Sequence, residues 1–211
     1  MVFLLFIMII ELKDLGKKYA REWIFKGVNL TLESGKAYAV IGGNGSGKST
    51  FLKLLAGISH PSKGEIKYIV DTNKVEADEI WKHLVLAGPY TELIEEFTLV
   101  EHLKFHASLK KMTKPVDEII EILGLEKSKN KQIQDFSSGM KQKLKLALAF
   151  FTEASILFLD EPTSNLDQRN IEWYQDWLPL VSNNKIVVIC SNQVYEYEYC
   201  NERISIESYK K

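Results

Sequence analysis

Residues 42 to 49 read Gly42-Gly43-Asn44-Gly45-Ser46-Gly47-Lys48-Ser49, which fits the pattern G-x-x-x-x-G-K-[ST]. The apolar run Ala37 to Ile41 precedes this segment and predicts a buried strand, and apolar residues at helical spacing follow it. Glycines let backbone N–H groups turn toward phosphate oxygens, and the start of a helix adds the positive end of its dipole. The segment therefore predicts a phosphate-binding loop. A turn that merely joins strand to helix would explain the glycines but not Lys48 and Ser49.

Two motifs carry the expected chemistry. In the first, Lys48 supplies a positive charge for the β- and γ-phosphates of a nucleotide, and the Ser49 hydroxyl is placed to bind Mg²⁺. The second motif, Ile156-Leu157-Phe158-Leu159-Asp160-Glu161, is an apolar run that ends in two carboxylates. We expect Asp160 to hold Mg²⁺, directly or through water, and Glu161 to take a proton from an attacking water. A helix N-cap is the alternative interpretation of these acids.

The composition is that of one globular domain. The chain has 211 residues, of which 45% are hydrophobic and 26% charged, and this excludes collagen-like, disordered and disulfide-scaffold classes. The 27 Lys and Arg residues nearly balance the 28 Asp and Glu residues, so the net charge is −1 and no strong field would steer nucleic acid to the chain. We therefore expect no nucleic-acid partner.

Hydrophobic patterning predicts an α/β fold. Residues 28–33 and 66–70 alternate between apolar and polar side chains, which suits antiparallel strands with one exposed face, and residues 88–138 read as mostly helical. Continuous apolar runs suit strands that are buried on both faces of a parallel sheet. There are three such runs, Ala37 to Ile41, Ile156 to Leu159 and Ile186 to Cys190.

A further segment carries a resemblance to a known family. Phe136-Ser137-Ser138-Gly139-Met140-Lys141-Gln142 precedes the acidic motif and opens a predicted helix. It resembles the signature of ATP-binding-cassette (ABC) nucleotide-binding domains, in the S-x-G-M-K-Q variant that many small transporter ATPases have. The resemblance extends from about Ile9 to Ile206. It implies a P-loop NTPase (RecA-like) core with a mostly parallel sheet, an antiparallel β subdomain and a helical signature subdomain.

The resemblance also implies subdomain boundaries. Residues 1–211 are expected to form a single ABC-type nucleotide-binding domain. Its core with the β subdomain is expected in residues 8–87 and 141–211, and the helical subdomain in residues 88–140. Met8 stands directly before the first predicted strand, so we expect residues 1–7 to be an extra leader with no structural role.

The family pattern implies nucleotide contacts outside the two motifs. Tyr19 occupies the place of an aromatic residue that stacks on adenine, and Ser164-Asn165-Leu166-Asp167 resembles the D-loop that links two nucleotide sites across a dimer. Ser137 and the backbone of residues 138–139 are expected to close over the γ-phosphate held by a partner cassette. The residues expected to contact nucleotide are Tyr19, Gly42, Gly43, Asn44, Gly45, Ser46, Gly47, Lys48, Ser49, Thr50, Ser137, Ser138, Gly139 and Asp167.

Two positions depart from the family pattern. The Q-loop glutamine, which reaches Mg²⁺ and the attacking water, should fall at or beside Pro89, yet the sequence has no glutamine between His83 and Val100. The switch histidine should follow the run Ile186 to Cys190, where this chain has Ser191 and then Asn192. We expect Asn192 to act in its place, although an amide can donate a hydrogen bond but cannot carry charge.

The implied activity is ATP hydrolysis that energises an ABC transporter, with ATP and Mg²⁺ bound. A single cassette forms half of each site, so the resemblance implies ATP-driven head-to-tail dimerisation of two copies or of paired cassettes. The sequence has no evident membrane span, so we expect a separate transmembrane permease to dock near residues 89–97 and hold the protein peripherally on the cytoplasmic face. Two alternatives stay open, a soluble ABC-type ATPase not coupled to transport and a slow-hydrolysing ATP-gated clamp.

Overall fold

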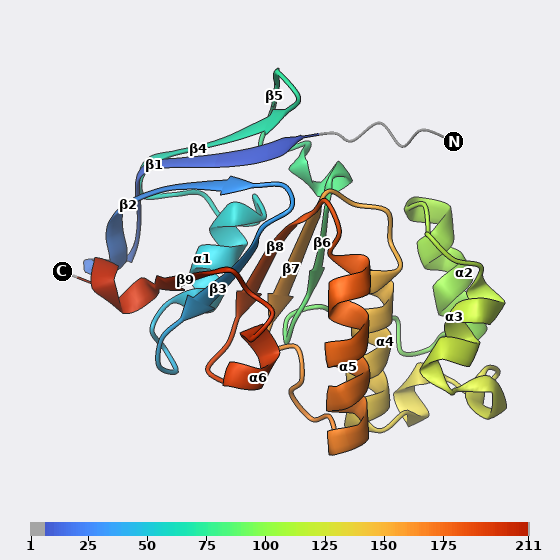
Figure 1. Cartoon of the computed structure of the whole chain (residues 1–211). Coiled ribbons are helices and arrows are strands. Elements are labelled where there is room, and N and C mark those ends of the chain that lie inside the picture. The colour runs from blue at the N-terminus through green and yellow to red at the C-terminus, as the bar shows by residue number, and fades with distance from the viewer. Residues whose placement is uncertain (1–6, 211) are drawn as a thin grey trace. The chain divides into compact units, whose positions relative to one another are not determined.

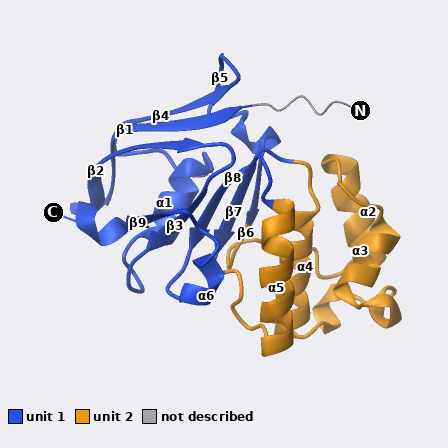
Figure 2. Ribbon diagram, viewed as in Figure 1, with its two compact units in different colours: residues 1–86, 154–161, 182–211 blue, residues 87–153, 162–181 orange. Residues whose placement is uncertain are grey.

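The computed structural model describes residues 7–210, which fold into two compact units (Figure 1, Figure 2). Unit 1 lies within residues 1–86, 154–161 and 182–211 and carries the sheets. Unit 2 comprises residues 87–153 and 162–181 and is mostly helical (Figure 2). The predicted α/β class is confirmed.

One sheet of unit 1 is antiparallel, with strand order β2-β1-β4-β5. β1 lies in the middle and pairs antiparallel with β2 on one edge and with β4 on the other. Alternate residues at its start, Met8, Ile10 and Leu12, are buried, as expected for a sheet with one covered face. The antiparallel strands predicted for residues 28–33 and 66–70 are therefore confirmed. The strands are β1 (Met8–Tyr19), β2 (Glu22–Glu33), β4 (Lys63–Val70) and β5 (Asn73–Val75).

The second sheet has strand order β6-β7-β8-β3-β9, and β3 pairs parallel with both β8 and β9 while β7 pairs parallel with β8. β7 and β8 are buried along their whole length, which accounts for their uninterrupted apolar sequence. The three predicted parallel strands are confirmed, and the middle one extends to Asp160. The strands are β3 (Ala37–Ile41), β6 (Leu84–Ala87), β7 (Ile156–Asp160), β8 (Ile186–Cys190) and β9 (Glu202–Ser205).

The parallel sheet brings three loops to one edge. Because β7, β8 and β3 are neighbours and point the same way, the segments that follow their carboxyl ends lie side by side. These segments hold the phosphate-loop motif, the acidic pair and Asn192. Helix α1 (Lys48–Leu55) begins at the end of the phosphate loop, and its Phe51 packs edge-to-face on Phe25 of β2 with ring centroids 5.7 Å apart. The shorter elements of unit 1 are η1 (Ile80–Lys82), α6 (Val194–Tyr197) and η4 (Ile206–Tyr209).

Unit 2 is held by capped helices and stacked aromatic side chains. Thr98 and Glu101 form a capping box at the start of α2, and Ser137 caps α4 by accepting a hydrogen bond from the backbone N–H of Met140 at 3.2 Å. Phe150 at the end of α4 stacks on Trp173 of α5, with centroids 5.8 Å apart. Its elements are α2 (Leu99–Leu109), α3 (Val116–Leu123), η2 (Glu126–Ser128), η3 (Ile133–Asp135), α4 (Ser138–Phe150) and α5 (Gln168–Val181).

Unit 2 is larger than the helical subdomain expected in residues 88–140, since it also takes in α4 and α5. The subdomain boundaries stay a prediction. Within residues 7–210, no helix combines the length and the apolar character that crossing a bilayer requires.

The expected leader is described only at Ile7, since residues 1–6 lie outside the described range. The backbone N–H of Ile7 donates to the Asp71 carboxylate at 3.0 Å, and the Ile7 carbonyl accepts from the Asp71 backbone N–H at 2.8 Å. At Ile7 these bonds continue the contact between the two strands by one residue, and the expectation of a leader over residues 1–7 stays a prediction.

The pairing of β1 with β4 generates a stability prediction. At Gly64 the backbone has φ of 77°, and a Cβ would lie 2.3 Å from the carbonyl oxygens of Lys13 and Asp14, at a shift in the register. Gly27 in β2 has nearly the same φ, 76°, but a Cβ there would have no atom within 4 Å. Both alanine variants incur the cost of the left-handed conformation, whereas only Gly64→Ala adds a backbone clash. We expect Gly64→Ala to lower the free energy of unfolding by about 1–3 kcal/mol more than Gly27→Ala does in urea titrations. Equal losses would contradict the clash.

Candidate functional site

The phosphate loop joins β3 to α1 in unit 1. Gly47 is the N-cap of α1 and has φ of 108°, a left-handed conformation that favours glycine. A Cβ at this position would also lie 2.5 Å from the Cγ2 atom of Ile24 in β2. The last glycine of the motif is therefore required both by its conformation and by the close approach of β2.

The ammonium of Lys48 lies inside this loop. Lys48 is only 5% exposed, and its Nζ donates to the carbonyl oxygens of Gly42 at 2.7 Å and Gly43 at 3.2 Å. It also donates to the side-chain oxygen of Asn192 at 3.0 Å. A buried cation is costly unless polar groups surround it, and the loop carbonyls together with the Asn192 side chain supply those groups to Lys48.

The acidic motif ends β7 next to this loop. Asp160 is 3% exposed, and burial raises the pKa of its carboxyl while the hydrogen bond from Ser49 opposes that rise. Among the described residues, the Oδ1 atom of Asp160 is buried without a hydrogen-bond partner. Glu161 has a φ of 46°, rare for a side chain of this kind, and its backbone N–H donates to the carbonyl of Cys190 in β8 at 2.9 Å. The two acids therefore differ, since Asp160 is enclosed beside Ser49 and Glu161 is partly exposed.

Asn192 connects the end of β8 with the phosphate loop. Its side-chain oxygen accepts from Lys48, and its Nδ2 donates to the side-chain oxygen of Asn44 at 2.6 Å. An amide can accept and donate at once, so one side chain bridges a cation and an acceptor. The structure thus brings Asn192 into the same site as Lys48, Asn44 and the acidic pair of β7.

One residue of this site has no sequence motif that would reveal it. Glu207 in η4 accepts a hydrogen bond from the backbone N–H of Gly43 at 2.9 Å. The two residues are 164 positions apart in the chain, so only the pairing of β9 with β3 places them together. A carboxylate therefore lies on an N–H group of the phosphate loop.

Tyr19 stands at the end of β1 and is 53% exposed. The Nζ atom of Lys17 lies 5.2 Å from the centroid of its ring, a cation–π contact. Lys17 is itself fixed, because it donates to the Ser59 hydroxyl at 2.8 Å and to the His60 carbonyl at 2.7 Å. The aromatic side chain expected to stack on adenine is thus available to solvent.

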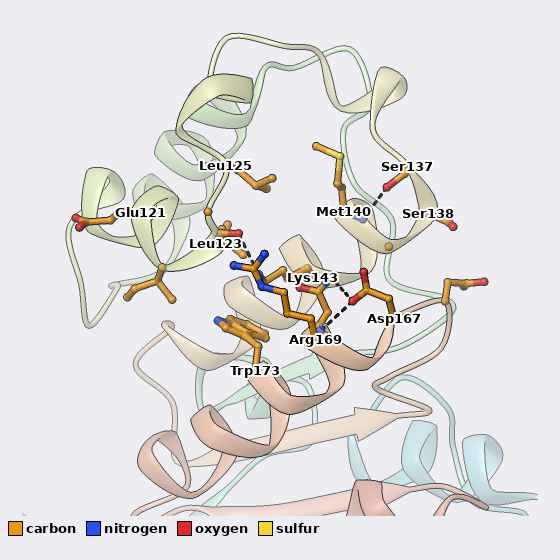
Figure 3. A pocket seen from close by; sticks show the side chains of 15 residues that line it. Glu121, Leu123, Leu125, Ser137, Ser138, Met140, Lys143, Asp167, Arg169 and Trp173 are labelled. Carbon is orange, nitrogen blue, oxygen red and sulfur yellow. Dashed lines mark hydrogen bonds between the residues drawn. The ribbon is translucent and has the colours of Figure 1, made fainter.

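Four of the expected residues lie in unit 2, around one cavity of about 640 Å³ (Figure 3), whereas Thr50 lies in α1 of unit 1. The cavity is bounded by the start of α4, the end of α3 and the start of α5. Lys143 reaches into this region, donates to the Leu123 carbonyl at 3.0 Å and lies 5.0 Å from the ring centroid of Trp173. Burial, and next the positive charge of Arg169, lower the pKa of Lys143, and the acids Glu121 and Asp167 line the same cavity. The expected residues that line it are Ser137, Ser138, Gly139 and Asp167.

Gly139 and Asp167 fix the shape of this cavity. A Cβ at Gly139 would lie 3.0 Å from the carbonyl oxygen of Asn165, so the start of α4 can approach the loop before α5 closely. Asp167 accepts from the backbone N–H and from the side-chain amide of Asn170, both at 2.9 Å, as a residue that caps the start of a helix does. The signature and D-loop segments are therefore ordered as one surface within unit 2.

The chain is similar to known proteins over nearly its whole length. It is 28% identical to the Nod factor export ATP-binding protein I of Burkholderia lata over 93% of this chain and 67% of that protein. It is 30% identical to the ATP-binding cassette sub-family A member 2 of Rattus norvegicus over 87% of this chain, but it spans only 8% of that longer protein. Comparisons with solved structures give a TM-score of 0.81, at 25% identity, with the ATP-binding subunit of an ABC transporter, over 94% of this chain and 87% of that one.

A dimeric structure of a bacterial ABC transporter cassette shares the fold, with a TM-score of 0.78 at 22% identity over 94% of this chain and 95% of that one. The fold is thus that of P-loop NTPase cassettes, as the resemblance implied. The sequence also matches the family model described as ABC transporter, over residues 25–164. This match spans more than half of the chain and includes the phosphate loop, the signature segment and the acidic pair, so the chain belongs to the ABC transporter family.

Proposed function

We propose that this protein binds ATP with Mg²⁺ and hydrolyses it to drive an ABC transporter. The observation that carries the proposal is the convergence of three loops at one edge of the parallel sheet, where Lys48, Asp160 and Asn192 follow three neighbouring strands. Relatives named as transporter ATP-binding proteins support the same function.

The phosphates are expected in the loop that encloses Lys48. Its ammonium already has three oxygen partners in the loop and on Asn192, and a nucleotide would take their place with stronger, charged acceptors. Tyr19 is proposed to stack on adenine, which its exposure permits. Gly42 to Thr50 form the remaining contacts through backbone N–H groups and hydroxyls.

The residues beside β7 fit Mg²⁺. Asp160 has a buried oxygen without a partner among the described residues, and the Ser49 hydroxyl lies next to it. Carboxylate and hydroxyl oxygens are the ligands that Mg²⁺ prefers. We therefore propose Ser49 and Asp160 as its ligands. When bound, Mg²⁺ neutralises charge that develops on the phosphate oxygens.

Glu161 is proposed as the general base, because it is less enclosed than Asp160 and follows it at the end of the strand. It takes a proton from the water that attacks the γ-phosphorus, while ADP leaves. Asn192 is proposed to donate to the γ-phosphate as its charge develops, since its amide already lies between Lys48 and Asn44.

The surface of unit 2 is proposed to complete the site of a second copy. Ser137 and the first amides of α4 offer donors to a phosphate, and the cations Lys143 and Arg169 line the adjoining cavity. The dimeric cassette with the same fold supports the pairing of two copies, which we propose to be head-to-tail. We also propose a separate transmembrane permease as partner, with the cassette peripheral on the cytoplasmic face, because relatives carry export and transport names.

A slow-hydrolysing ATP-gated clamp is the second candidate function. The observation that favours it is the neutral amide of Asn192 at the position where the family pattern has histidine. A clamp would close on ATP in the same way and differ only in its turnover rate.

Replacing the proposed general base tests both the role of Glu161 and the ATP-driven pairing of two copies of the chain. Glu161→Gln keeps the shape of the side chain but cannot accept a proton, so turnover should fall about 10²–10⁴-fold while ATP still binds. With Mg-ATP this variant should elute as a dimer in size-exclusion chromatography. Adding Ser137→Arg, which places bulk at the start of α4, should keep it monomeric. Hydrolysis by Glu161→Gln at the wild-type rate would rule out Glu161 as the base.

Replacing Asn192 distinguishes an ATPase that drives a transporter from a slow-hydrolysing ATP-gated clamp. An imidazole donates through a ring N–H toward the γ-phosphate, so Asn192→His should raise phosphate release several-fold, up to the roughly 10²-fold worth of one preorganised donor. The imidazolium that forms below about pH 6.5 also donates, so the gain should persist there. Steady-state assays with and without the permease measure both effects. Fast wild-type hydrolysis that the histidine leaves unchanged would mean that another residue acts as the switch.

Removing the negative charge of Glu207 tests whether the nucleotide phosphates bind at the phosphate loop. Glu207→Gln retains an acceptor for the Gly43 N–H and removes a negative charge near the expected phosphates. The repulsion between two like unit charges about 4 Å apart in water is worth about 1 kcal/mol. Removing it should let the variant bind Mg-ADP about fivefold more tightly in calorimetry. Glu198→Gln, at an exposed acid after α6, is the control, and Lys48→Ala should weaken binding at least tenfold. Unchanged affinity in Glu207→Gln would place the phosphates away from Gly43.

A further inference from the structure

A buried carboxylate lies behind the turn that carries Asn192. Glu196 in α6 is 2% exposed, and the Ser191 hydroxyl donates to its Oε2 atom. Ser191 is itself fully buried at the end of β8. Burying a carboxylate is costly unless the group is hydrogen-bonded, and Ser191 supplies such a bond to Glu196, which is not part of any motif used above.

The bonds around Ser191 have a fixed direction. A carboxylate only accepts, so the hydroxyl proton of Ser191 points at Glu196 and leaves the hydroxyl oxygen free to accept. That oxygen accepts from the backbone N–H of Gln193 at 2.8 Å. The backbone N–H of Ser191 donates to Val40 of β3 at 3.3 Å. Both residues that flank Asn192 are thereby held in place.

Asn192 depends on this support because it is itself exposed. Its side chain reaches Lys48 and Asn44 from a turn, and no packed core surrounds it. Without Glu196, the Ser191 hydroxyl has another acceptor at 3.5 Å, the Gln193 carbonyl. Rotation of the O–H bond toward that carbonyl would turn the lone pairs of the hydroxyl oxygen away from the Gln193 N–H and loosen the turn.

We propose that Glu196 is a positioning residue, which acts through Ser191 to aim the Asn192 amide at the phosphate loop. The proposal rests on the function proposed above for Asn192. In this role Glu196 acts through the geometry of the turn. The helix that carries it has a second anchor in Tyr197, whose ring lies 5.5 Å from the guanidinium carbon of Arg203, so removing Glu196 leaves α6 attached.

A double-mutant cycle tests the route through Asn192. Glu196→Ala should lower kcat for ATP about tenfold with little change in KM, and Ser191→Ala should do the same. Glu196→Gln should restore most of the rate, because its amide oxygen still accepts from Ser191. In an Asn192→Ala background, Glu196→Ala should cause no further loss of kcat. Glu198→Ala, at the exposed acid two positions on, is the matched control and should keep the wild-type rate.

A second readout does not depend on turnover. The side-chain amide signal of Asn192, assigned by its disappearance in Asn192→Ala, should be sharp in the wild type and in Glu196→Gln and broadened or shifted in Glu196→Ala. Full additivity of the two losses in kcat, or an unchanged amide signal in Glu196→Ala, would overturn the proposal. A loss of kcat in Glu196→Ala together with a wild-type rate in Asn192→Ala would also overturn it. Absence of ATPase activity in every protein with the amide signals as expected would instead count against the proposed function and support the positioning role.

Discussion

The site depends on one constraint, the ammonium of Lys48 held at 5% exposure inside a loop of backbone carbonyls. A cation in that position must be surrounded by oxygen atoms, so the loop has to curl around it and its glycines have to adopt conformations that other residues avoid. The loop lies between the end of β3 and the start of α1. The parallel sheet fixes the position of the end of β3 and places the loops that follow β7 and β8 beside it.

The acids at the end of β7 differ from Lys48, because the described part of the protein does not supply partners for all of their oxygen atoms. Burial raises the pKa of Asp160, and one of its oxygens is buried without a partner among the described residues. Such an arrangement is unfavourable for the protein by itself and favourable once a cation binds. Glu161 holds an unusual backbone conformation next to it. Strain and an unpaired oxygen at consecutive residues are typical of sites built for a ligand rather than for stability.

Asn192 gives the site a neutral bridge. Its amide accepts from Lys48 and donates to Asn44. The turn that carries it is supported from behind by buried polar groups, so the polar network extends from α6 through β8 to the phosphate loop. Glu207 adds a second contact to this loop from the C-terminal part of the chain. The loop is therefore held on two sides by residues distant in sequence.

Local sequence patterns determined the parallel strands, the antiparallel strands, the phosphate loop and the acidic pair, because strand periodicity and glycine spacing are properties of short segments. Asn192 was found by its place in the family pattern, and its contacts with Lys48 and Asn44 required the structure. Glu196 and Glu207 could not be found in this way, since an acid on a short helix has no distinctive pattern, and the Glu207 contact spans 164 positions of the chain. Ile7 shows the same limit, because its bonds depend on the register between β1 and β4. The sequence by itself thus determined which elements form and where the motifs lie, whereas only the tertiary structure decided which distant side chains meet them, because strand pairing brings together residues that no local pattern connects.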